Sequence, residues 1–326
     1  MKLRVAVIYG GRSGEHEISL RSAKSIMDAM DPDKYKILHY MISKEGKWRP
    51  RPIVPEPNGN SEIDVVFPVL HGTFGEDGTI QGLLELADLP YVGAGVLGSS
   101  ASMDKEVMKR LAKERGLPVV EYMTLLANHI DNLEDICKAF PFPMFVKPAN
   151  LGSSVGISKA RNCVELKSAL ELAAAYDRKV IVERGIIGRE FECAVLGNDD
   201  PIASVPCEIL PSRDFYDYDD KYLLDEAQTN IPANLTPEQT DEVRRLAVEC
   251  YRAVECEGMG RVDFLLENAT GKIYINEINT IPGFTSISMY PKMWEHSGLP
   301  MAKLIDRLIE LAIERHKIKA RLRYWK

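Results

Sequence analysis

The sequence has no long hydrophobic run and few cysteines. None of its apolar stretches reaches the roughly 18 residues that a membrane-spanning helix requires, so we expect no membrane span. The run Leu3–Tyr9 breaks into glycines and charges, which indicates a buried strand and not a signal peptide. The six cysteines include no CxxC pair. We therefore expect free thiols and a cytoplasmic protein.

The sequence also lacks an excess of positive charge. Its 48 acidic and 41 basic residues give a net charge of −7, which argues against a general nucleic-acid or polyanion binder, although a local cationic pocket for a small phosphate ligand is compatible with it. Hydrophobic residues make up 45% and charged residues 27%, as in globular proteins, which excludes a disordered chain. A length of 326 residues predicts two or three packed units.

The amino-terminal third alternates strands with helices. Buried strands are expected at Leu3–Tyr9, Ile37–Ile42 and Asp64–Leu70, with helices at Ser19–Met30 and Thr79–Ala87. This alternation is typical of an α/β unit with a parallel sheet.

Two changes of character divide the rest of the chain. A polar helix predicted at Met103–Arg115 follows a boundary near Ser102, and Gly185 and Gly188 mark a second boundary after the strand Lys179–Glu183. We therefore predict an α/β protein of three units: 1–102, 103–187 and 188–326.

The third unit is predicted to contain a strong helix and a hairpin. Thr236 is a suitable N-cap for the helix Pro237–Glu257. The strands Arg261–Leu266 and Lys272–Ile278 are separated by a short turn and should pair antiparallel. The long irregular stretch Pro211–Pro232 is typical of a lid or a disordered segment.

Two glycine-rich loops follow strands of the first unit. Gly10–Gly14 does not match the dinucleotide pattern GxGxxG, and a tight turn and an anion site explain it about equally well. Glu15 adds a carboxylate that suits a substrate ammonium. The loop His71–Gly78 lies at the carboxyl end of a strand, where ligands gather in parallel sheets. His71 alone is more often structural, but the glycines with Glu76 and Asp77 favour a site.

The loop Asn150–Gly156 resembles a phosphate-covering loop. Its glycines permit unusual dihedral angles, and Ser153 and Ser154 add hydrogen-bond donors. Lys147 ends an apolar strand, so its ammonium needs an anionic partner, either a carboxylate or a ligand phosphate. The loop does not match the Walker pattern, which argues against P-loop chemistry.

The predicted hairpin carries the strongest candidate site. Glu277 and Asn279 are two residues apart and point to the same face, where strand pairing can bring Asp263 beside them. Two carboxylates and an amide oxygen suit Mg²⁺ bound to nucleotide phosphates. Arg261 shares the face of Asp263 and could neutralise a transferring phosphoryl group. A solvated face with ion pairs is the alternative, but it does not explain the donor-rich turn at 280–286.

Taken together, these motifs make the sequence closely similar to the D-alanine–D-alanine ligases of the ATP-grasp superfamily. The similarity covers nearly the whole chain in the expected order, through GGRSGEHEISL, HGTFGEDGTIQGLLE, SMDK, FVKPANLGSSVGISK, FYDYDDKY, GRVDF and NEINTIPGFTSISMYP. It implies the ATP-grasp fold, with an amino-terminal parallel-sheet domain and with ATP between the central and carboxyl-terminal units.

The resemblance implies specific roles in ATP and metal binding. Lys105 and Lys147 would contact phosphates, and Glu183 would read the adenine amino group. Glu190 would hold the ribose, and the Ser153 loop would cover the phosphates. The implied ATP-binding set is Lys105, Lys147, Ser153, Ser154, Glu183, Glu190, Lys221 and Asn276, and two Mg²⁺ ions, which Mn²⁺ could replace, are assigned to Asp263, Glu277 and Asn279.

The resemblance also implies a mechanism. The first D-alanine would attack the γ-phosphate to give an acyl phosphate, which the amine of the second D-alanine would then attack. Arg261 and the backbone N–H of Gly283 would stabilise the oxyanion, and Glu15 would anchor the first ammonium. Lys221 and Ser288 would hold the second carboxylate. The implied catalytic set is Glu15, His71, Ser153, Tyr222, Arg261, Gly283 and Ser288.

Two residues bear on the second substrate. D-lactate-selecting relatives lack the tyrosine of the DKY motif, which is present here as Tyr222. Resistance-type relatives often carry arginine at the position of Met289. The resemblance therefore favours D-alanine. The resemblance further implies a lid at Pro211–Glu226, a homodimer, and peptidoglycan precursor synthesis.

Other functions are less consistent with these motifs. Another ATP-grasp ligase, of the D-Ala-D-Ser or D-Ala-D-Lac type, would share the metal and phosphate residues. The sequence lacks the third glycine and the ribose-binding carboxylate that a nicotinamide-dependent oxidoreductase requires. A catalytically dead nucleotide-binding regulator does not explain the intact set Arg261, Asp263, Glu277 and Asn279.

Overall fold

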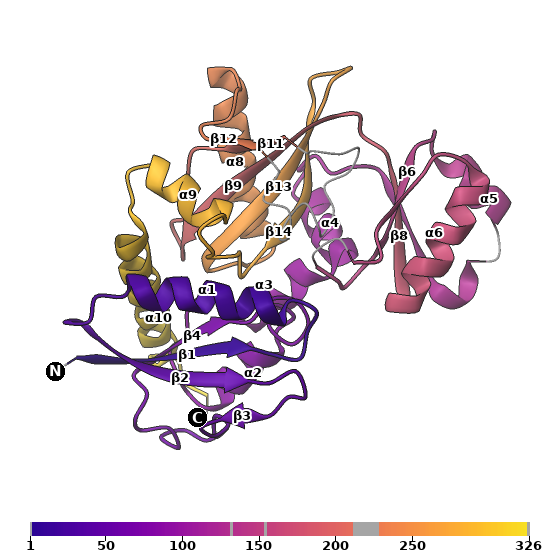
Figure 1. The fold of residues 1–326 in the computed structure, drawn as a ribbon. Helices are drawn as coiled ribbons and strands as arrows, with labels where there is room; N and C mark the ends of the chain where they lie inside the picture. The colour runs from indigo at the N-terminus through magenta and orange to yellow at the C-terminus, as the bar shows by residue number, and fades with distance from the viewer. Residues whose placement is uncertain (1, 131–132, 153–154, 211–227, 325–326) are drawn as a thin grey trace.

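The computed structural model describes residues 2–130, 133–152, 155–210 and 228–324. These residues form three β-sheets with helices packed around them (Figure 1). Each sheet lies within one of the three predicted segments, although the segment boundaries themselves stay a prediction. No helix in the described ranges is both long enough and apolar enough to cross a bilayer.

The first sheet has the strand order β3-β2-β1-β4, and β1 pairs parallel with both β2 and β4. Alternate residues of β1 enter two cores, because Val5 and Val7 face one side while Ala6 and Ile8 face the other. The elements of this part are β1 (Leu3–Gly10), α1 (His16–Ala29), β2 (Tyr35–Ile42), β3 (Trp48–Arg49), β4 (Val65–Val69), α2 (Thr79–Leu86) and α3 (Val96–Met103).

The second sheet, in the order β5-β8-β6-β7, is antiparallel and packs against α6. Val146 and Val182 enter the core of this unit, so the neighbouring Lys147 and Glu183 point to the opposite face. Its elements are α4 (Lys105–Glu114), β5 (Tyr122–Leu126), the short 3₁₀ helix Ala127–His129, α5 (Leu133–Ala139), β6 (Met144–Pro148), β7 (Ser158–Ala160), α6 (Cys163–Tyr176) and β8 (Lys179–Arg184).

The third sheet has the order β12-β11-β9-β13-β14, with β10 paired to β9. The expected antiparallel hairpin is present as β13 and β14. Its elements are β9 (Gly188–Gly197), β10 (Ile202–Ala203), β11 (Cys207–Leu210), β12 (Gln228–Asn230), α8 (Pro237–Ala253), β13 (Gly258–Glu267), β14 (Ile273–Asn279), α9 (Met289–His296) and α10 (Met301–Lys319).

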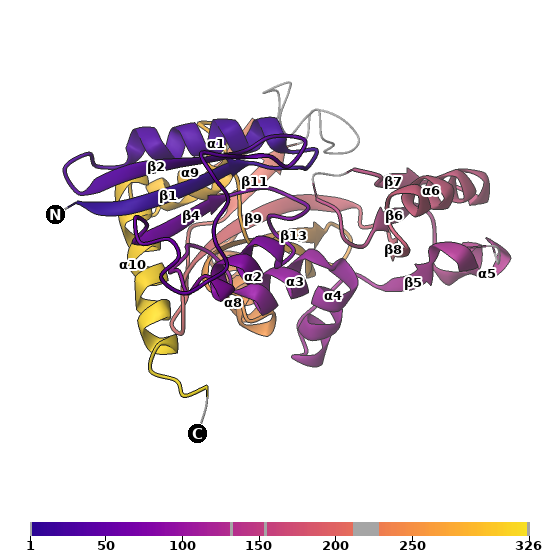
Figure 2. The same ribbon diagram turned by 90° about the horizontal axis from the view of Figure 1, so that it is seen from below.

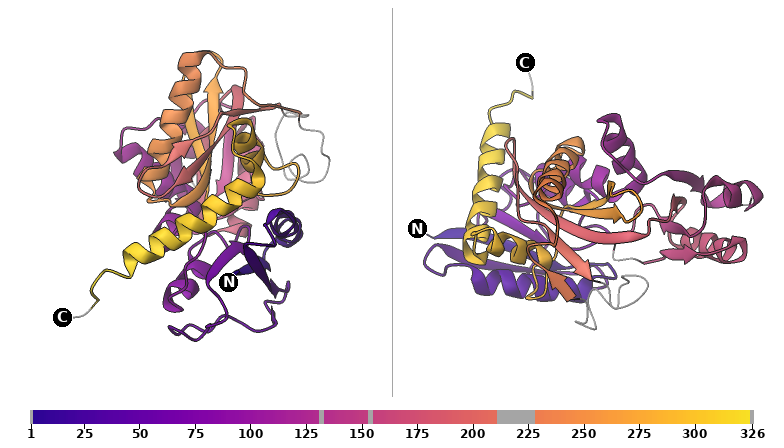
Figure 3. Two further views of the ribbon diagram at one scale, coloured as in Figure 1. Left: turned by 90° about the vertical axis from the view of Figure 1, so that its left-hand side faces the viewer. Right: turned by 90° about the horizontal axis from the view of Figure 1, so that it is seen from above.

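The last helix connects the first and third sheets. α10 contacts α1 and β4 as well as β9 and β13 (Figures 2 and 3). Leu304, Ile305 and Leu308 are fully buried in a core that includes residues of both sheets. This shared core fixes the loops of the first unit against one face of the third sheet, where the candidate site lies.

The helix predicted at Met103–Arg115 is present as α4 (Lys105–Glu114). It begins two residues later than expected, because the side chain of Asp104 accepts hydrogen bonds from the backbone N–H groups of Glu106 and Val107 and so caps the helix. The structure corrects one expectation. Cys137 and Cys163 form a disulfide with their Cα atoms 5.7 Å apart, so the expectation of free thiols is wrong for this pair. The free cysteines of the described residues, all buried, are Cys193, Cys207, Cys250 and Cys256.

Candidate active site

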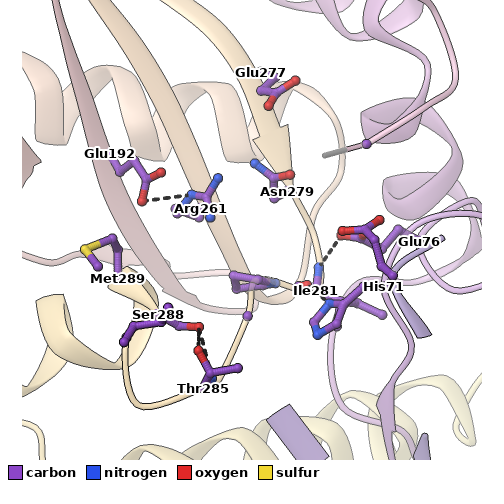
Figure 4. A pocket seen from close by; sticks show the side chains of 15 residues that line it. His71, Glu76, Glu192, Arg261, Glu277, Asn279, Ile281, Thr285, Ser288 and Met289 are labelled. Atoms are coloured by element: carbon purple, nitrogen blue, oxygen red, sulfur yellow. Dashed lines mark hydrogen bonds and ion pairs between the residues drawn. The ribbon is translucent and has the colours of Figure 1, made fainter. Parts of the chain in front are cut away.

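A polar cavity of about 80 Å³ lies where the loops of the first unit meet the third sheet (Figure 4). Its lining is charged on several sides, since carboxylates, a guanidinium and an imidazole all reach it. The residues that line it are Glu15, His71, Glu76, Gly152, Glu192, Arg261, Glu277, Asn279, Ile281–Gly283, Thr285 and Ile287–Met289.

Strand pairing places the predicted metal ligands side by side. Asp263 lies directly opposite Glu277 in the β13–β14 ladder, and the amide of Asn279 donates to Asp263 Oδ2 at 3.1 Å. Arg261 lies opposite Asn279 and donates from Nε and Nη2 to the two oxygens of Asp263, at 2.7 Å each. The hairpin therefore gathers the four predicted side chains in one place.

The donor set of this cluster fits a divalent metal bound with a nucleotide. In the described residues no group of three or more His, Cys, Asp or Glu side chains is arranged to hold a metal ion. The predicted set supplies only the carboxylates of Asp263 and Glu277 and the amide oxygen of Asn279. Such an incomplete shell suits Mg²⁺, which keeps several waters and takes substrate phosphate oxygens as ligands.

Glu183, on β8 of the second sheet, is held between two buried lysines. Its Oε1 is 2.8 Å from Lys109 Nζ and its Oε2 is 2.7 Å from Lys147 Nζ. Burial works against the charge on Glu183, but the two ammonium groups outweigh it and hold the pKa at about 2. The anionic partner that Lys147 requires is thus a carboxylate in this structure.

Two predicted phosphate-binding lysines, Lys147 and Lys105, reach from the second sheet and α4 to residues of β14. Lys147 also donates to Asn276 Oδ1 at 3.0 Å, which connects β6 with β14. Lys105 donates to the carbonyl of Leu151 at 2.6 Å, and its Nζ lies 3.4 Å from Glu277 Oε2. A line of ammonium groups therefore leads from Glu183 to the predicted metal ligands, as an extended polyphosphate would require.

His71 connects the first unit to the segment after β14. Its Nδ1 lies 2.9 Å from the carbonyl of Ile281 and its Nε2 lies 3.1 Å from Ser22 Oγ. Ser22 Oγ also accepts the backbone N–H of Phe284 at 3.2 Å. The carbonyl can only accept, so Nδ1 carries the proton. Burial, which outweighs the hydrogen bond to Ile281 and the charge of Glu15, lowers the pKa of His71. The neutral ring thus positions the turn that contains Gly283.

Replacing Ser22 by alanine tests this connection. The variant should lose about 2 kcal/mol of unfolding free energy, because a buried N–H and a ring nitrogen lose their common partner. The Michaelis constant for a substrate that binds beside this turn should rise as the turn loosens. Denaturant unfolding and steady-state kinetics measure both effects. Ser25→Ala on the same helix, where the hydroxyl donates to the carbonyl of Arg21, is the control and should change neither quantity. Equal losses in the two variants would contradict the role of Ser22.

Two more carboxylates line the cavity from the first unit. A Cβ at Gly72, whose φ is +72°, would collide with Glu15 Oε2, and a Cβ at Gly152 would lie 3.3 Å from it. The carboxylate of Glu15 is thus enclosed by two glycines. Glu76 accepts the backbone N–H groups of Gly72 at 2.7 Å and Ile281 at 3.1 Å. Burial, and then the charge of Glu15, raise the pKa of Glu76 to about 8.

The turn after β14 places the last predicted groups. Ser288 Oγ accepts the backbone N–H of Thr285 at 2.9 Å and lies 2.8 Å from its hydroxyl. A Cβ at Gly283 would lie 2.7 Å from Ser288 Oγ, so only glycine fits there without displacing that hydroxyl. Gly283 and Ser288 both line the cavity.

The remaining predicted residues fall into two groups. Glu190 lies on β9, two residues before Glu192, and is not among the residues that line the cavity. Four others lie outside the described residues, so the predictions made for them stay untested: Ser153, Ser154, Lys221 and Tyr222.

The sequence interpretation missed two charged residues that the structure brings to the site. Glu192 is buried, lines the cavity and lies 3.2 Å from Arg261 Nε. Lys109 is fully buried against Glu183. Each had a weak signal, since Lys109 is one helical turn after Lys105 and Glu192 shares a strand face with Glu190.

The sequence matches two described families, which together cover most of the chain. Residues 4–58 and 50–94 match the family described as D-ala D-ala ligase N-terminus, and residues 111–310 match D-ala D-ala ligase C-terminus. A protein of Solibacter usitatus named D-alanine--D-alanine ligase is 69% identical over 324 residues, which is 99% of each chain.

Two solved structures are similar throughout. The D-alanine-D-alanine ligase from Coxiella burnetii is 39% identical and superposes with a TM-score of 0.87, over 98% of this chain and 96% of its own. The VanG D-Ala:D-Ser ligase from Enterococcus faecalis is 35% identical with the same TM-score, over 96% of this chain and 100% of its own. Overall shape therefore does not separate ligases that differ in the second substrate.

Proposed function

Because the chain belongs to the D-alanine–D-alanine ligase family, we propose that it joins two D-alanine molecules in an ATP-dependent reaction, for the synthesis of peptidoglycan precursors. The observation that supports this most directly is the single cavity shared by Glu15, Arg261, Glu277 and Asn279. In this cavity the carboxylate of Glu15, which can bind an amine, faces side chains that suit a metal ion and phosphate. Family membership removes the oxidoreductase alternative.

The reaction needs activation because a carboxylate is a poor electrophile. We assign the first D-alanine to the pocket beside Glu15, whose carboxylate binds the substrate ammonium. The substrate carboxylate then attacks the γ-phosphate of ATP, ADP leaves, and an acyl phosphate forms. The amine of the second D-alanine attacks the acyl carbon, and phosphate leaves. Of the two oxygens of the original carboxylate, one stays in the new amide and the other leaves in the phosphate.

The charged side chains divide this work. Lys105 and Lys147 neutralise phosphates, and Arg261 with the backbone N–H of Gly283 stabilises the oxyanion of the tetrahedral intermediate. Asp263, Glu277 and Asn279 would hold divalent metal, Mg²⁺ or Mn²⁺, which supplies neutralisation of phosphate charge when bound. Ser288, beside Gly283, contacts the carboxylate of the second substrate.

D-alanine is preferred as second substrate for a local reason. Met289 lines the cavity, and its Sδ packs 3.6 Å from Cys207 Sγ. An apolar wall offers no partner to the side-chain hydroxyl of D-serine. A ligase of the D-Ala-D-Ser type is the second candidate, because the fold of VanG is equally similar.

Phosphate release from ATP and Mg²⁺ tests the function. We expect release with D-alanine alone, and D-alanyl-D-alanine by mass spectrometry. Release that requires D-serine or D-lactate beside D-alanine would overturn the substrate assignment and leave ATP-dependent ligation in place. No release with any of these substrates would overturn the function, and L-alanine serves as the control that should give none.

We further propose a homodimer in the cytoplasm, with units divided at 102 and 187. Leu86 on α2 and Leu97 on α3 are exposed apolar side chains of the first unit, which supports a subunit contact on that side.

A further inference from the structure

Arg261 is shared by two carboxylates, and one of them is also a proposed metal ligand. Asp263 holds the guanidinium with two hydrogen bonds of 2.7 Å. Glu192 Oε2 lies 3.2 Å from Nε of the same guanidinium (Figure 4). On the proposed function, on which this inference rests, Asp263 is a metal ligand. The oxygens of Asp263 cannot serve a bidentate bond to Arg261 and a divalent ion equally well.

The position of Glu192 is rigidly determined. It lies on β9 directly opposite Asp263, and ten consecutive residue pairs join β9 to β13. Its side chain is only 9% exposed and that of Arg261 is 17% exposed. The three strands therefore present a row of three carboxylates, Glu192, Asp263 and Glu277, beside one guanidinium.

Like charges placed side by side on neighbouring strands repel one another. In this row Arg261 compensates the two carboxylates that it contacts, and Lys105 approaches the third at 3.4 Å. When Asp263 binds metal, its charge is compensated by the ion and Arg261 loses its strongest partner. Glu192 is then the carboxylate that the structure places against the guanidinium.

We propose that Glu192 is a positioning residue for Arg261. Its carboxylate holds the guanidinium at the wall of the cavity when Asp263 binds metal. It also makes Arg261 a weaker competitor with the metal ion for the oxygens of Asp263. The two effects are separable, because the first acts on turnover and the second on metal affinity. Neither requires Glu192 to touch substrate.

A double-mutant cycle tests this role with two measurements. Glu192→Gln should lower kcat about tenfold with little change in the KM for ATP, and should weaken the binding of Mn²⁺ in the presence of ADP several-fold. Electron paramagnetic resonance of free Mn²⁺ measures that binding without turnover. In a protein that already carries Arg261→Met, Glu192→Gln should change neither quantity, because the group on which it acts is absent.

Two further variants serve as controls. Glu208→Gln, on β11, removes a buried carboxylate that pairs with Arg189 at 2.7 Å outside the cavity, and it should leave kcat and Mn²⁺ affinity unchanged. Glu192→Asp retains the charge and should recover part of both losses. If Glu192→Gln fails to fold, Glu192→Asp is used in the cycle instead, because its shorter side chain withdraws the carboxylate from Arg261 and should show a smaller loss of both quantities that also disappears with Arg261→Met.

The outcomes are distinct. The positioning role would be overturned if Glu192→Gln had the Mn²⁺ affinity and kcat of the wild type. It would also be overturned if Glu192→Gln caused equal losses in the wild-type protein and in the Arg261→Met protein. The proposed function is judged separately by dipeptide formation in the wild-type protein, so failure of one does not imply failure of the other.

Discussion

Replacing Glu277 by glutamine should lower kcat by at least about 1,000-fold and leave the unfolding temperature nearly unchanged. Glu277 faces Asp263 across the hairpin, and its side chain is 20% exposed at the edge of the cavity. Glutamine has the same shape, so packing is retained. What is lost is one of the two carboxylate charges assigned to metal, and with it the neutralisation of the γ-phosphate during transfer.

The measurement is ADP formation at saturating ATP, Mg²⁺ and D-alanine, followed by Mn²⁺ binding in the presence of ADP. Glu249→Gln on α8 is a matched control, because its carboxylate pairs with Arg252 and is not among the residues that line the cavity. It should retain full activity. Near-wild-type turnover of Glu277→Gln with Mg²⁺ would contradict the assignment of the metal site.

The hairpin shows why the candidate site could be anticipated from the sequence. Alternation along a strand places Glu277 and Asn279 on one face, and a short turn forces the pairing that brings Asp263 opposite Glu277. Both rules act over fewer than twenty residues. The parallel sheet of the first unit follows in the same way from alternating strands and helices.

Groups joined over long sequence distances could not be found in this way. Lys109 and Glu183 are separated by 74 residues, and no spacing rule relates a helix face to a strand in another part of the chain. Glu192 acquires its partner only through the β9–β13 register. The disulfide of Cys137 and Cys163 likewise depends on the packing of α5 against α6.

The start of α4 is a local feature that the sequence predicts to within two residues. The helix is expected from Met103, and the side chain of Asp104, which accepts two backbone N–H groups, sets the true start at Lys105. The cap matters for the site, because α4 carries Lys105 and Lys109, which approach Glu277 and Glu183.

Replacing Glu183 by glutamine should lower the free energy of unfolding by about 3 kcal/mol at pH 7. The substitution leaves the ammonium groups of Lys109 and Lys147 buried without the carboxylate that lies within 2.8 Å of both. Denaturant unfolding measures the loss. Glu134→Gln, which removes an 80% exposed carboxylate paired with Lys138, is the control and should change stability by less than about 0.5 kcal/mol.

The dependence on pH identifies the charge as the cause. The pKa of Glu183 is about 2 in the folded protein and near 4.5 when the side chain is unperturbed. Its ionisation therefore stabilises the fold fully above about pH 4.5, and this contribution is lost as the pH falls toward 2. The difference between wild type and Glu183→Gln should follow the same course. Adding Lys109→Met to Glu183→Gln should recover part of the loss, because it removes an uncompensated buried cation. If the difference in unfolding free energy stays constant from pH 7 to pH 3 and the double variant shows no recovery, the loss comes from packing and not from charge.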